Sequence, residues 1–406
     1  MDTVTIKALR RSWVHASGLC NPGHSARAAL ATAGWLPARG GVGTYLSVRC
    51  RYLGVTREQV DAFIADDTVR VTPAAHGHWM IVPEDDCQLA LSLSQLLARS
   101  SFESAQGLLS VPTSELEMGA KIVLELLRES PLNTRALFRA VPQGVVRSLG
   151  EEGRRMGYPS TLMMVMKFLE AQGLVGVWPE GDRIDGVLHR WDLLEPKVQV
   201  IGDSSTVIHQ LILRYIGLSG ASTVSGFSNW SGLGVEQSKH GFEKLDLHPF
   251  RVEGREVVYA DESTATQLLG GVPQVPKSLA LPLEDPLFGY REGLSALLDQ
   301  DHNNISVTVS GRGVVSLGDL HRVPFRPILI EGSLGGFWEY DDEEQVISYT
   351  LFDRMRGGDL RRLELELEAL ADWLFSSFGH AKAHHSESLR SRRDRLRSVQ
   401  ALKGQQ

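Results

Sequence analysis

Three short stretches of the sequence carry cationic and polar side chains that suit contact with phosphate groups. Arginine and lysine neutralise phosphates, and serine, threonine and glutamine donate hydrogen bonds to their oxygens. The stretches contain Arg39, Arg49 and Arg51; Ser160, Thr161 and Lys167; and Gln237, Ser238, Lys239 and His240. We therefore predict a phosphate-binding surface. The alternative is that these residues form solvated faces of modules that serve in dimerisation or as scaffolds.

Other kinds of chemistry find little support in the sequence. The three cysteines, Cys20, Cys50 and Cys87, lie far apart and form no Cys-x-x-Cys pair, which argues against a zinc site or a disulfide framework. No P-loop, Gly-x-Ser-x-Gly or His-Glu-x-x-His motif is present. We predict no metal and no nucleotide cofactor.

The hydropathy pattern bears on location. No stretch of about 18 apolar residues occurs, and the first residues, MDTVTIKALRRSW, contain no apolar signal-peptide core. The scattered cysteines fit a reducing compartment. These observations predict a soluble, cytoplasmic protein with no membrane partner.

The clearest structural pattern lies in residues 116–205. Apolar residues at helical spacing predict a helix over 115–128, and Asn133 is placed to cap a short helix that Pro142 ends. A third helix is predicted from Ser160 to Gly173, followed by strands at 174–178 and 187–193. Three helices and a hairpin in this order are typical of a winged helix, which binds duplex DNA through its third helix.

The same order recurs on both sides of this segment. Residues 206–275 show three helical stretches and a hairpin of HPFRV (248–252) and EVVYA (256–260). Residues 1–115 show helices near 6–17 and 25–34, a capping box at Thr56 and Gln59, and strands at 69–72 and 79–82. We predict an α+β protein with three tandem winged helices, at 1–115, 116–205 and 206–275.

The remainder of the chain, residues 276–406, has a different composition. Residues 276–358 are rich in glycine, proline and short alternating runs, which predict a small antiparallel β-barrel. Leucines at helical spacing predict a C-terminal helix over 359–378. Residues 379–406 are polar and arginine-rich and contain His380, His384 and His385, so we predict a basic flexible tail.

The net charge of -7 conceals an uneven distribution. Residues 1–205 carry 21 basic and 22 acidic side chains, whereas residues 206–358 carry 12 and 20. A neutral half can still hold a basic face, because a sum hides local asymmetry. The charges predict that DNA would lie along the N-terminal half.

Several pieces of the sequence resemble the AlkZ/YcaQ family of winged-helix DNA glycosylases. They are AGWLPARGGVGTYLSVRCRYLGVTREQVDAFIADDTVRV (33–71), HGHWMIVPEDD (76–86), LILRYIG (211–217), GFSNWSGL (226–233), EDPLFGYREGLSALLD (284–299) and FRPILIEGSLGGFWEY (325–340). The resemblance covers nearly the whole chain in order. It implies three winged helices and a barrel around duplex DNA, and an enzyme that removes bulky N7-alkylated purines or unhooks interstrand crosslinks.

The sequence departs from this family at the catalytic motif. The resemblance implies a Gln-apolar-Gln or Gln-apolar-Asp motif that holds the attacking water, yet its two polar positions fall on Pro37 and Arg39. Proline offers no side-chain acceptor, and arginine only donates and is always charged. No glutamine occurs before Tyr52. The family's Arg-Gly-Thr-aliphatic-His wing is replaced by His76-Gly77-His78-Trp79-Met80, which makes His76 and His78 weak candidates for a chemical role.

Three functional hypotheses follow. The first is a monomeric protein that binds duplex DNA, including alkylated DNA, with divergent or lost catalysis and with Arg39, Arg49, Lys167 and Lys239 on phosphates. The second is an active monofunctional glycosylase that excises N7-alkylpurines or unhooks crosslinks. The third is a transcription regulator or interaction scaffold, whose acidic block at 206–358 would favour a basic partner.

Overall fold

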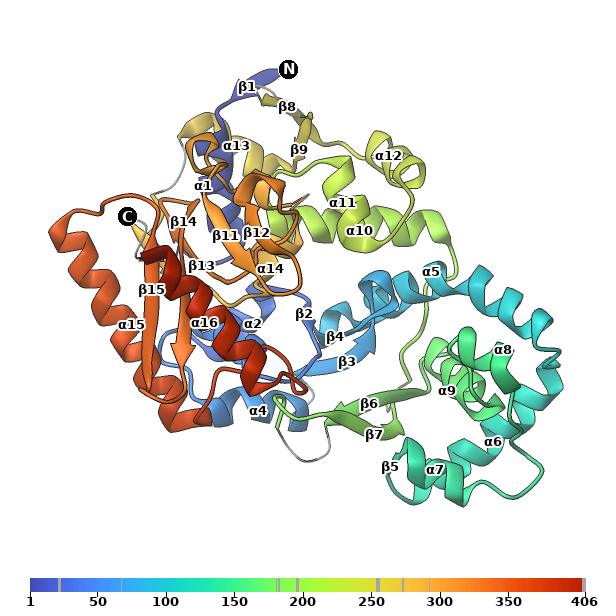
Figure 1. Ribbon diagram of the computed structural model, residues 1–406. Helices are drawn as coiled ribbons and strands as arrows, with labels where there is room; N and C mark the ends of the chain where they lie inside the picture. The colour runs from blue at the N-terminus through green and yellow to red at the C-terminus, as the bar shows by residue number, and fades with distance from the viewer. Residues whose placement is uncertain are drawn as a thin grey trace.

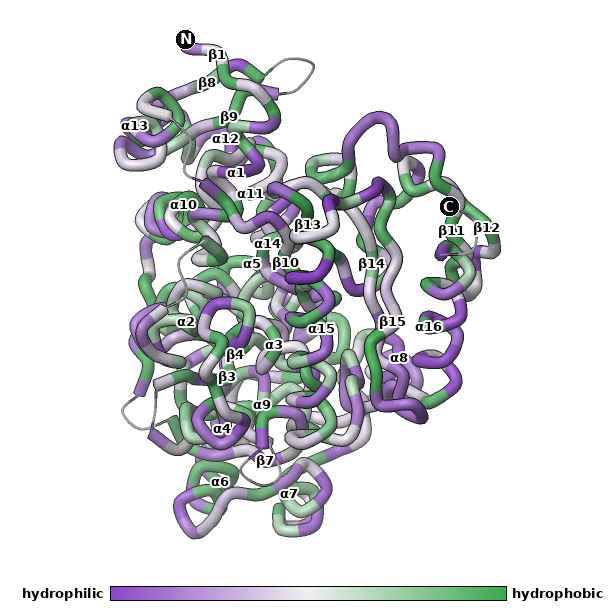
Figure 2. The backbone as a smooth tube through the Cα atoms, turned by 90° about the vertical axis from the view of Figure 1, so that its left-hand side faces the viewer, coloured by the Kyte–Doolittle hydropathy of each residue, from purple (hydrophilic) through white to green (hydrophobic). Residues whose placement is uncertain are grey.

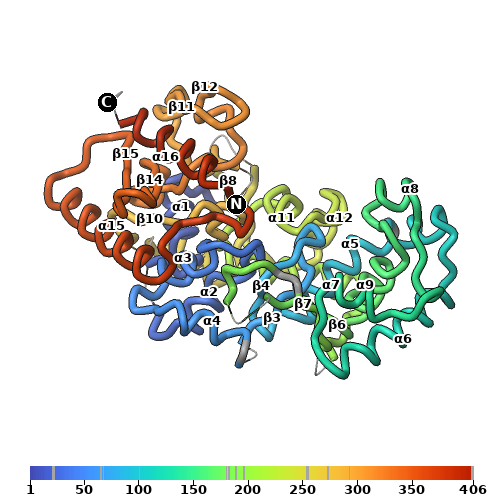
Figure 3. The backbone as a smooth tube through the Cα atoms, turned by 60° about the horizontal axis from the view of Figure 1, so that its bottom comes forward, coloured from blue at the N-terminus to red at the C-terminus, as the bar shows by residue number. Residues whose placement is uncertain are grey.

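The computed structural model describes residues 1–20, 23–66, 68–179, 181, 183–194, 197–252, 256–271, 274–291 and 293–403. Short helices and small sheets pack around several buried apolar clusters. The segment from α6 (Thr113–Glu129) to α9 (Thr161–Ala171) forms one end of the molecule, and the sheet with α15 (Gly357–Phe378) and α16 (Leu389–Lys403) forms the other (Figures 1 and 3). No helix of the described residues is both long and apolar enough to cross a membrane.

The N-terminal segment contains a small antiparallel sheet in the order β2-β4-β3. Its elements are β1 (Asp2–Val4), α1 (Ile6–Ala16), α2 (Ala26–Ala33), β2 (Leu36–Pro37), α3 (Gly43–Arg49), α4 (Arg57–Ala65), β3 (Val69–Pro73) and β4 (Trp79–Pro83). The predicted capping box is confirmed, because Thr56 accepts from the Gln59 amide while the Gln59 side chain accepts from the Thr56 amide. The predicted strand pair corresponds to β3 and β4.

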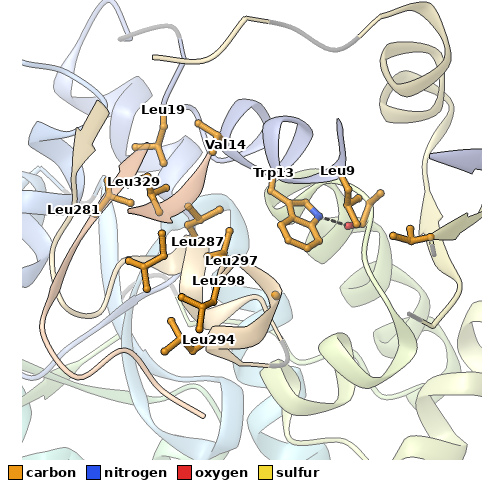
Figure 4. Close-up of a cluster of buried hydrophobic side chains, with 14 of the residues drawn as sticks. Leu9, Trp13, Val14, Leu19, Leu281, Leu287, Leu294, Leu297, Leu298 and Leu329 are labelled. Atoms are coloured by element: carbon orange, nitrogen blue, oxygen red, sulfur yellow. Dashed lines mark hydrogen bonds between the residues drawn. The ribbon is translucent and has the colours of Figure 1, made fainter. Parts of the chain in front are cut away.

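The first helix packs elsewhere than predicted. β1 pairs in parallel with β8 (His248–Val252), and the Trp13 indole on α1 donates to the Ala221 carbonyl at 2.6 Å. Figure 4 shows Trp13 in the same apolar cluster as Leu287 and Leu297, with Leu329 of the C-terminal sheet on the far side of that cluster. The apolar face of α1 therefore stabilises the third and fourth segments. Helical periodicity locates such a face but does not say which partner it covers.

The second segment contains the helices and strands predicted for residues 116–205, together with α5 (Cys87–Leu108) and α8 (Gly150–Arg155), which the sequence pattern did not indicate. It contains α5 (Cys87–Leu108), α6 (Thr113–Glu129), β5 (Leu132–Asn133), α7 (Thr134–Ala140), α8 (Gly150–Arg155), α9 (Thr161–Ala171), β6 (Val175–Pro179) and β7 (Leu188–Leu193). The Asn133 side chain caps α7, and Gly173 ends α9 with a positive φ of 67°. The strands form a sheet in the order β5-β7-β6.

The third segment is built on an aromatic cluster. Its elements are α10 (Ser204–Ser219), α11 (Val224–Ser231), α12 (Val235–Glu243), β8, β9 (Val258–Ala260) and α13 (Glu262–Gly270). Tyr215 stacks on Trp230, and Trp35 of the first segment approaches Trp230 to 5.0 Å between ring centroids. This contact joins the first and third segments through a shared core.

The fourth segment, in its described residues, does not form the predicted β-barrel. Its four-stranded sheet is open and has the order β10-β13-β14-β15, while β11 and β12 form a separate hairpin. The elements are β10 (Ser278–Ala280), α14 (Pro286–Gly289), β11 (Ser306–Val309), β12 (Gly313–Ser316), β13 (Arg326–Ile330), β14 (Ser333–Asp341), β15 (Val346–Leu351), α15 (Gly357–Phe378) and α16 (Leu389–Lys403). Among the described strands β15 does not pair with β10, so the sheet does not close.

Two helices cover opposite faces of this sheet. Trp338 packs with buried leucines of α15, and its neighbour Phe337 lies in the cluster that includes Val399 of α16. Because successive strand residues point to opposite faces, the two helices sandwich β14. The predicted helix over 359–378 is confirmed as α15.

The prediction of a flexible tail is wrong for Leu389–Lys403. These residues form α16, which lies along β15 and is mostly hydrophilic (Figure 2). Its arginines make ion pairs with the sheet, including Arg392 with Asp342 at 2.6 Å and Arg395 with Glu339 at 2.9 Å. Charge pairing therefore supplies contacts of α16 that the sequence pattern failed to show.

Candidate nucleic-acid interface

The motif positions lie next to the β3–β4 loop, residues 74–78. Pro37 pairs with Met80, and the Ala38 amide donates to the Trp79 carbonyl at 3.1 Å. The Arg39 carbonyl accepts from the backbone amide of His385 at 3.1 Å, and the Val42 amide donates to the Lys382 carbonyl at 2.8 Å. The 37–42 segment is thus held on one side by β4 and on the other by the stretch before α16.

Four basic side chains gather at this loop. The charges of Arg39, His76 and Arg322 all act on His78, and the rings of His76 and His78 lie 6.0 Å apart. We call Arg39, His76, His78 and Arg322 the basic cluster. All four side chains are exposed, so the cluster is open to a ligand.

The environment of His78 favours its neutral form. Partial burial, and then the positive charges of Arg39, His76 and Arg322, lower the pKa of His78 below its usual value near 6.5. Binding of an anion such as phosphate would oppose this effect. The cluster therefore has electrostatic reason to attract a negatively charged partner.

His76 is held by the backbone of the third segment. Its φ is 55°, which is unusual for a residue with a side chain, and its Nε2 lies 2.7 Å from the Asn229 carbonyl oxygen. This contact fixes the β3–β4 loop against α11. His76 therefore has a structural role in addition to its exposure.

Arg39 forms an ion pair that the sequence did not indicate. Its Nη1 donates to Glu284 Oε1 at 2.9 Å, and the two side chains are 50% and 37% exposed. Pro37 contributes no hydrogen-bonding side chain. The pair lies at the place where the family motif was expected.

The structure contradicts the predicted phosphate role of Arg51 and shows that Arg49 makes contacts within the protein. Arg51 is 1% exposed, pairs with both carboxylate oxygens of Asp285, and donates to the Ser17 and Ser47 carbonyls. Arg49 donates to the Leu53 carbonyl and lies over the Trp373 ring at 5.0 Å. Burial lowers the pKa of Arg49. Both arginines hold elements together, and the buried Arg51 is not accessible to a phosphate.

The residues predicted on α9 are also engaged within the protein. Thr161 is buried, and its hydroxyl accepts from the Arg147 amide at 3.1 Å. Lys167 pairs with buried Glu170 at 2.5 Å and lies over the Trp79 ring. It lines a cavity of about 550 Å³ between α5 and α9 together with Phe102. Ser160, the N-cap residue of α9, is half-buried, and its side chain accepts no capping hydrogen bond.

The predicted residues on α12 are divided between surface and core. Gln237, Lys239 and His240 are exposed and available to a partner. Ser238 is fully buried, and its hydroxyl donates to the Gly234 carbonyl at 2.9 Å. The exposed three remain candidate contacts, and Ser238 does not.

Sequence reasoning missed Glu284 and Arg322. Glu284 lies within a stretch that resembles the family, but nothing in the sequence pairs it with Arg39, which is 245 residues away. Arg322 stands in a loop without a recognisable motif. Within the described ranges, no three His, Cys, Asp or Glu residues are grouped so that they could hold a metal ion.

The family model described as "DNA glycosylase AlkZ-like" matches residues 43–373 of the sequence. The chain belongs to the AlkZ-like family of DNA glycosylases. Its fold is similar to that of the Streptomyces sahachiroi DNA glycosylase AlkZ, with a TM-score of 0.68 and 19% identity over 91% of this chain and 97% of the other. No curated protein matches the sequence. The matched AlkZ-like range begins after Pro37 and Arg39.

Proposed function

We propose that this AlkZ-like protein binds duplex DNA, including alkylated duplexes, and that its catalysis does not use the polar pair of the family motif. One observation carries the proposal: an arginine of the basic cluster stands where the family resemblance implies a water-holding glutamine or aspartate. Arginine suits a phosphate, whereas a cationic sugar would be repelled by it. Exposed residues of α12 would add contacts.

Further features of the proposal concern organisation. The helix and strand order of the first three segments supports three tandem winged helices, and the open sheet with α15 and α16 would complete the DNA-binding unit. We propose a cytoplasmic protein that acts as a monomer. Neither DNA binding nor the proposed chemistry requires a metal or a nucleotide cofactor.

A second candidate function is active excision of N7-alkylpurines. The Arg39–Glu284 pair favours it, because this pair brings a carboxylate to the motif position. No comparable feature at the motif position favours a role as transcription regulator or scaffold. Release of 7-methylguanine from duplex DNA would distinguish the enzyme from a protein that only binds DNA.

Arg39→Gln is expected to weaken duplex binding and to reduce the slope of log K against log salt by about 1, because one phosphate contact is lost. Fluorescence anisotropy with a labelled duplex, over a salt series that starts at about 50 mM, measures both quantities.

Arg361→Gln is the matched control, since Arg361 is similarly exposed and pairs with carboxylates on α15. It should leave the salt slope unchanged. If the wild-type protein fails to bind duplex DNA at about 50 mM salt, the proposal is wrong, because phosphate contacts are strongest there.

A further inference from the structure

We propose that Glu284 is the catalytic carboxylate of this protein and that it activates the water that attacks C1′ of an N7-alkylpurine nucleotide. The proposal rests on the proposed function as a DNA-binding AlkZ-like protein. It assigns to a residue of the fourth segment the role that the family motif would otherwise supply from positions 37 and 39. The following contacts support this assignment.

Glu284 belongs to the fourth segment, and its side chain contacts Arg39 at the position expected for the family motif. Its carboxylate accepts from Arg39 Nη1 at 2.9 Å, and its side chain is 37% exposed, so water has access to it. A carboxylate accepts a proton from water and stabilises a positive charge, which neither Pro37 nor Arg39 can do. The ion pair therefore brings a proton-accepting carboxylate to the motif position, where Pro37 and Arg39 supply none.

The backbone on both sides of Glu284 is held firmly. Asp285 is fully buried, binds Arg51 through both oxygens, and accepts from the Leu287 amide at 3.0 Å. On the other side the Leu281 amide donates to the Pro327 carbonyl at 2.9 Å. Arg51 is thus a positioning residue for the Glu284 backbone. A carboxylate on such a rigid support has the preorganisation that catalysis needs.

The Arg39 side of the pair is held equally well. The Ala38 amide is bonded to β4, and the Arg39 carbonyl accepts from the His385 amide and lies 2.9 Å from the His385 ring Nδ1. Both residues of the ion pair thus extend from anchored backbone. Only their side chains are free to change partners.

The basic cluster explains how DNA could free the carboxylate. A phosphate drawn to Arg39, His76, His78 and Arg322 would compete with Glu284 for the Arg39 guanidinium. An exposed ion pair is weak, so this exchange of partners costs little. The freed carboxylate would then lie beside a bound sugar-phosphate backbone.

The chemical step balances without a co-reactant. An N7-alkylated purine carries a positive charge, and it leaves as a neutral base with the electron pair of the C1′–N9 bond. The sugar becomes an oxocarbenium ion, which the Glu284 carboxylate stabilises. The oxygen of water forms a bond to C1′, and one proton passes to Glu284 and then to solvent. The products are an abasic site, the free alkylated base and a proton.

The test is a comparison of the full chain with Glu284→Gln. Single-turnover release of 7-methylguanine from a duplex should fall by about 10²-fold or more, the typical contribution of a general base. Duplex affinity, measured by anisotropy, should change by less than about twofold. The thermal midpoint should be unchanged, because the lost ion pair is exposed.

Glu331→Gln is the matched control, since Glu331 is also partly exposed and pairs with lysines on the surface. It should release base at the wild-type rate. If Glu284→Gln also does so, the assignment of Glu284 is wrong. If the wild-type protein binds duplex DNA but releases no base, the catalytic proposal fails while the binding proposal stands. Absence of binding overturns both.

Discussion

Asp285→Ala is expected to lower the free energy of unfolding by about 3–5 kcal/mol, because it leaves the buried Arg51 charge without its carboxylate. Both side chains are almost completely buried, at 1% and 0% exposure. Burial lowers the pKa of Arg51, but Asp285 outweighs this effect and raises it, so the arginine is charged in the folded state. Urea denaturation followed by tryptophan fluorescence measures the loss.

Two variants make the result interpretable. Glu151→Ala removes a carboxylate from an exposed ion pair with Arg154 and should cost less than about 0.5 kcal/mol. The double variant Arg51→Met with Asp285→Leu replaces both charges by apolar groups and should be much milder than Asp285→Ala. An Asp285→Ala protein as stable as Glu151→Ala would show that Arg51 does not depend on Asp285.

Glu339→Ala is expected to have a similarly large effect at the other end of the molecule. Glu339 pairs with Arg326 of β13 and Arg395 of α16, and all three side chains are largely buried. Its removal leaves two cations short of a partner and should cost about 3–5 kcal/mol. Hydrogen exchange should show the greatest loss of protection in α16, because Arg395 anchors this helix.

The control for this change lies nearby. Glu343→Ala breaks an exposed ion pair with Arg393 of the same helix and should leave protection of α16 nearly unchanged. Equal exchange in Glu339→Ala and Glu343→Ala would contradict the anchoring role of Arg395.

Acid should release α16 in the same way. Burial raises the pKa of Glu387, but its bond from Arg395 outweighs burial and lowers the pKa below the usual 4.5. A carboxylate whose pKa is lowered by folding stabilises the fold at pH values above the pKa that it has in the unfolded chain. This contribution is lost as the pH falls toward its pKa in the folded state. Loosening of α16 is therefore expected below about pH 4.5.

Local features of the fold could be predicted because they depend on neighbouring residues. The capping box of α4, the Asn133 cap of α7 and the glycine that ends α9 each act within a few residues. The strands β3 and β4 were likewise visible from their alternation. Closure of the sheet was not, because alternation does not reveal which edges pair.

The candidate site was harder to predict because its contacts join distant parts of the chain. Arginine is a residue type that usually lies at the surface, and only the position of Asp285 shows that Arg51 is buried. The Arg39–Glu284 pair spans 245 residues. α16 escaped prediction for a related reason: its polar composition resembles that of a solvated tail, and its partners lie on β14.

The bonds from Lys382 and His385 to the segment around Arg39 have a consequence for biosynthesis. His385 is translated 346 residues after Arg39, so the nascent chain emerges with this segment unsupported on one side. β4 can hold it early, but the second support arrives only near the end of elongation. The Arg39–Glu284 pair is therefore assembled late, and a transcript cut before Lys382 would yield a protein whose 37–42 segment is loose although every residue in it is present.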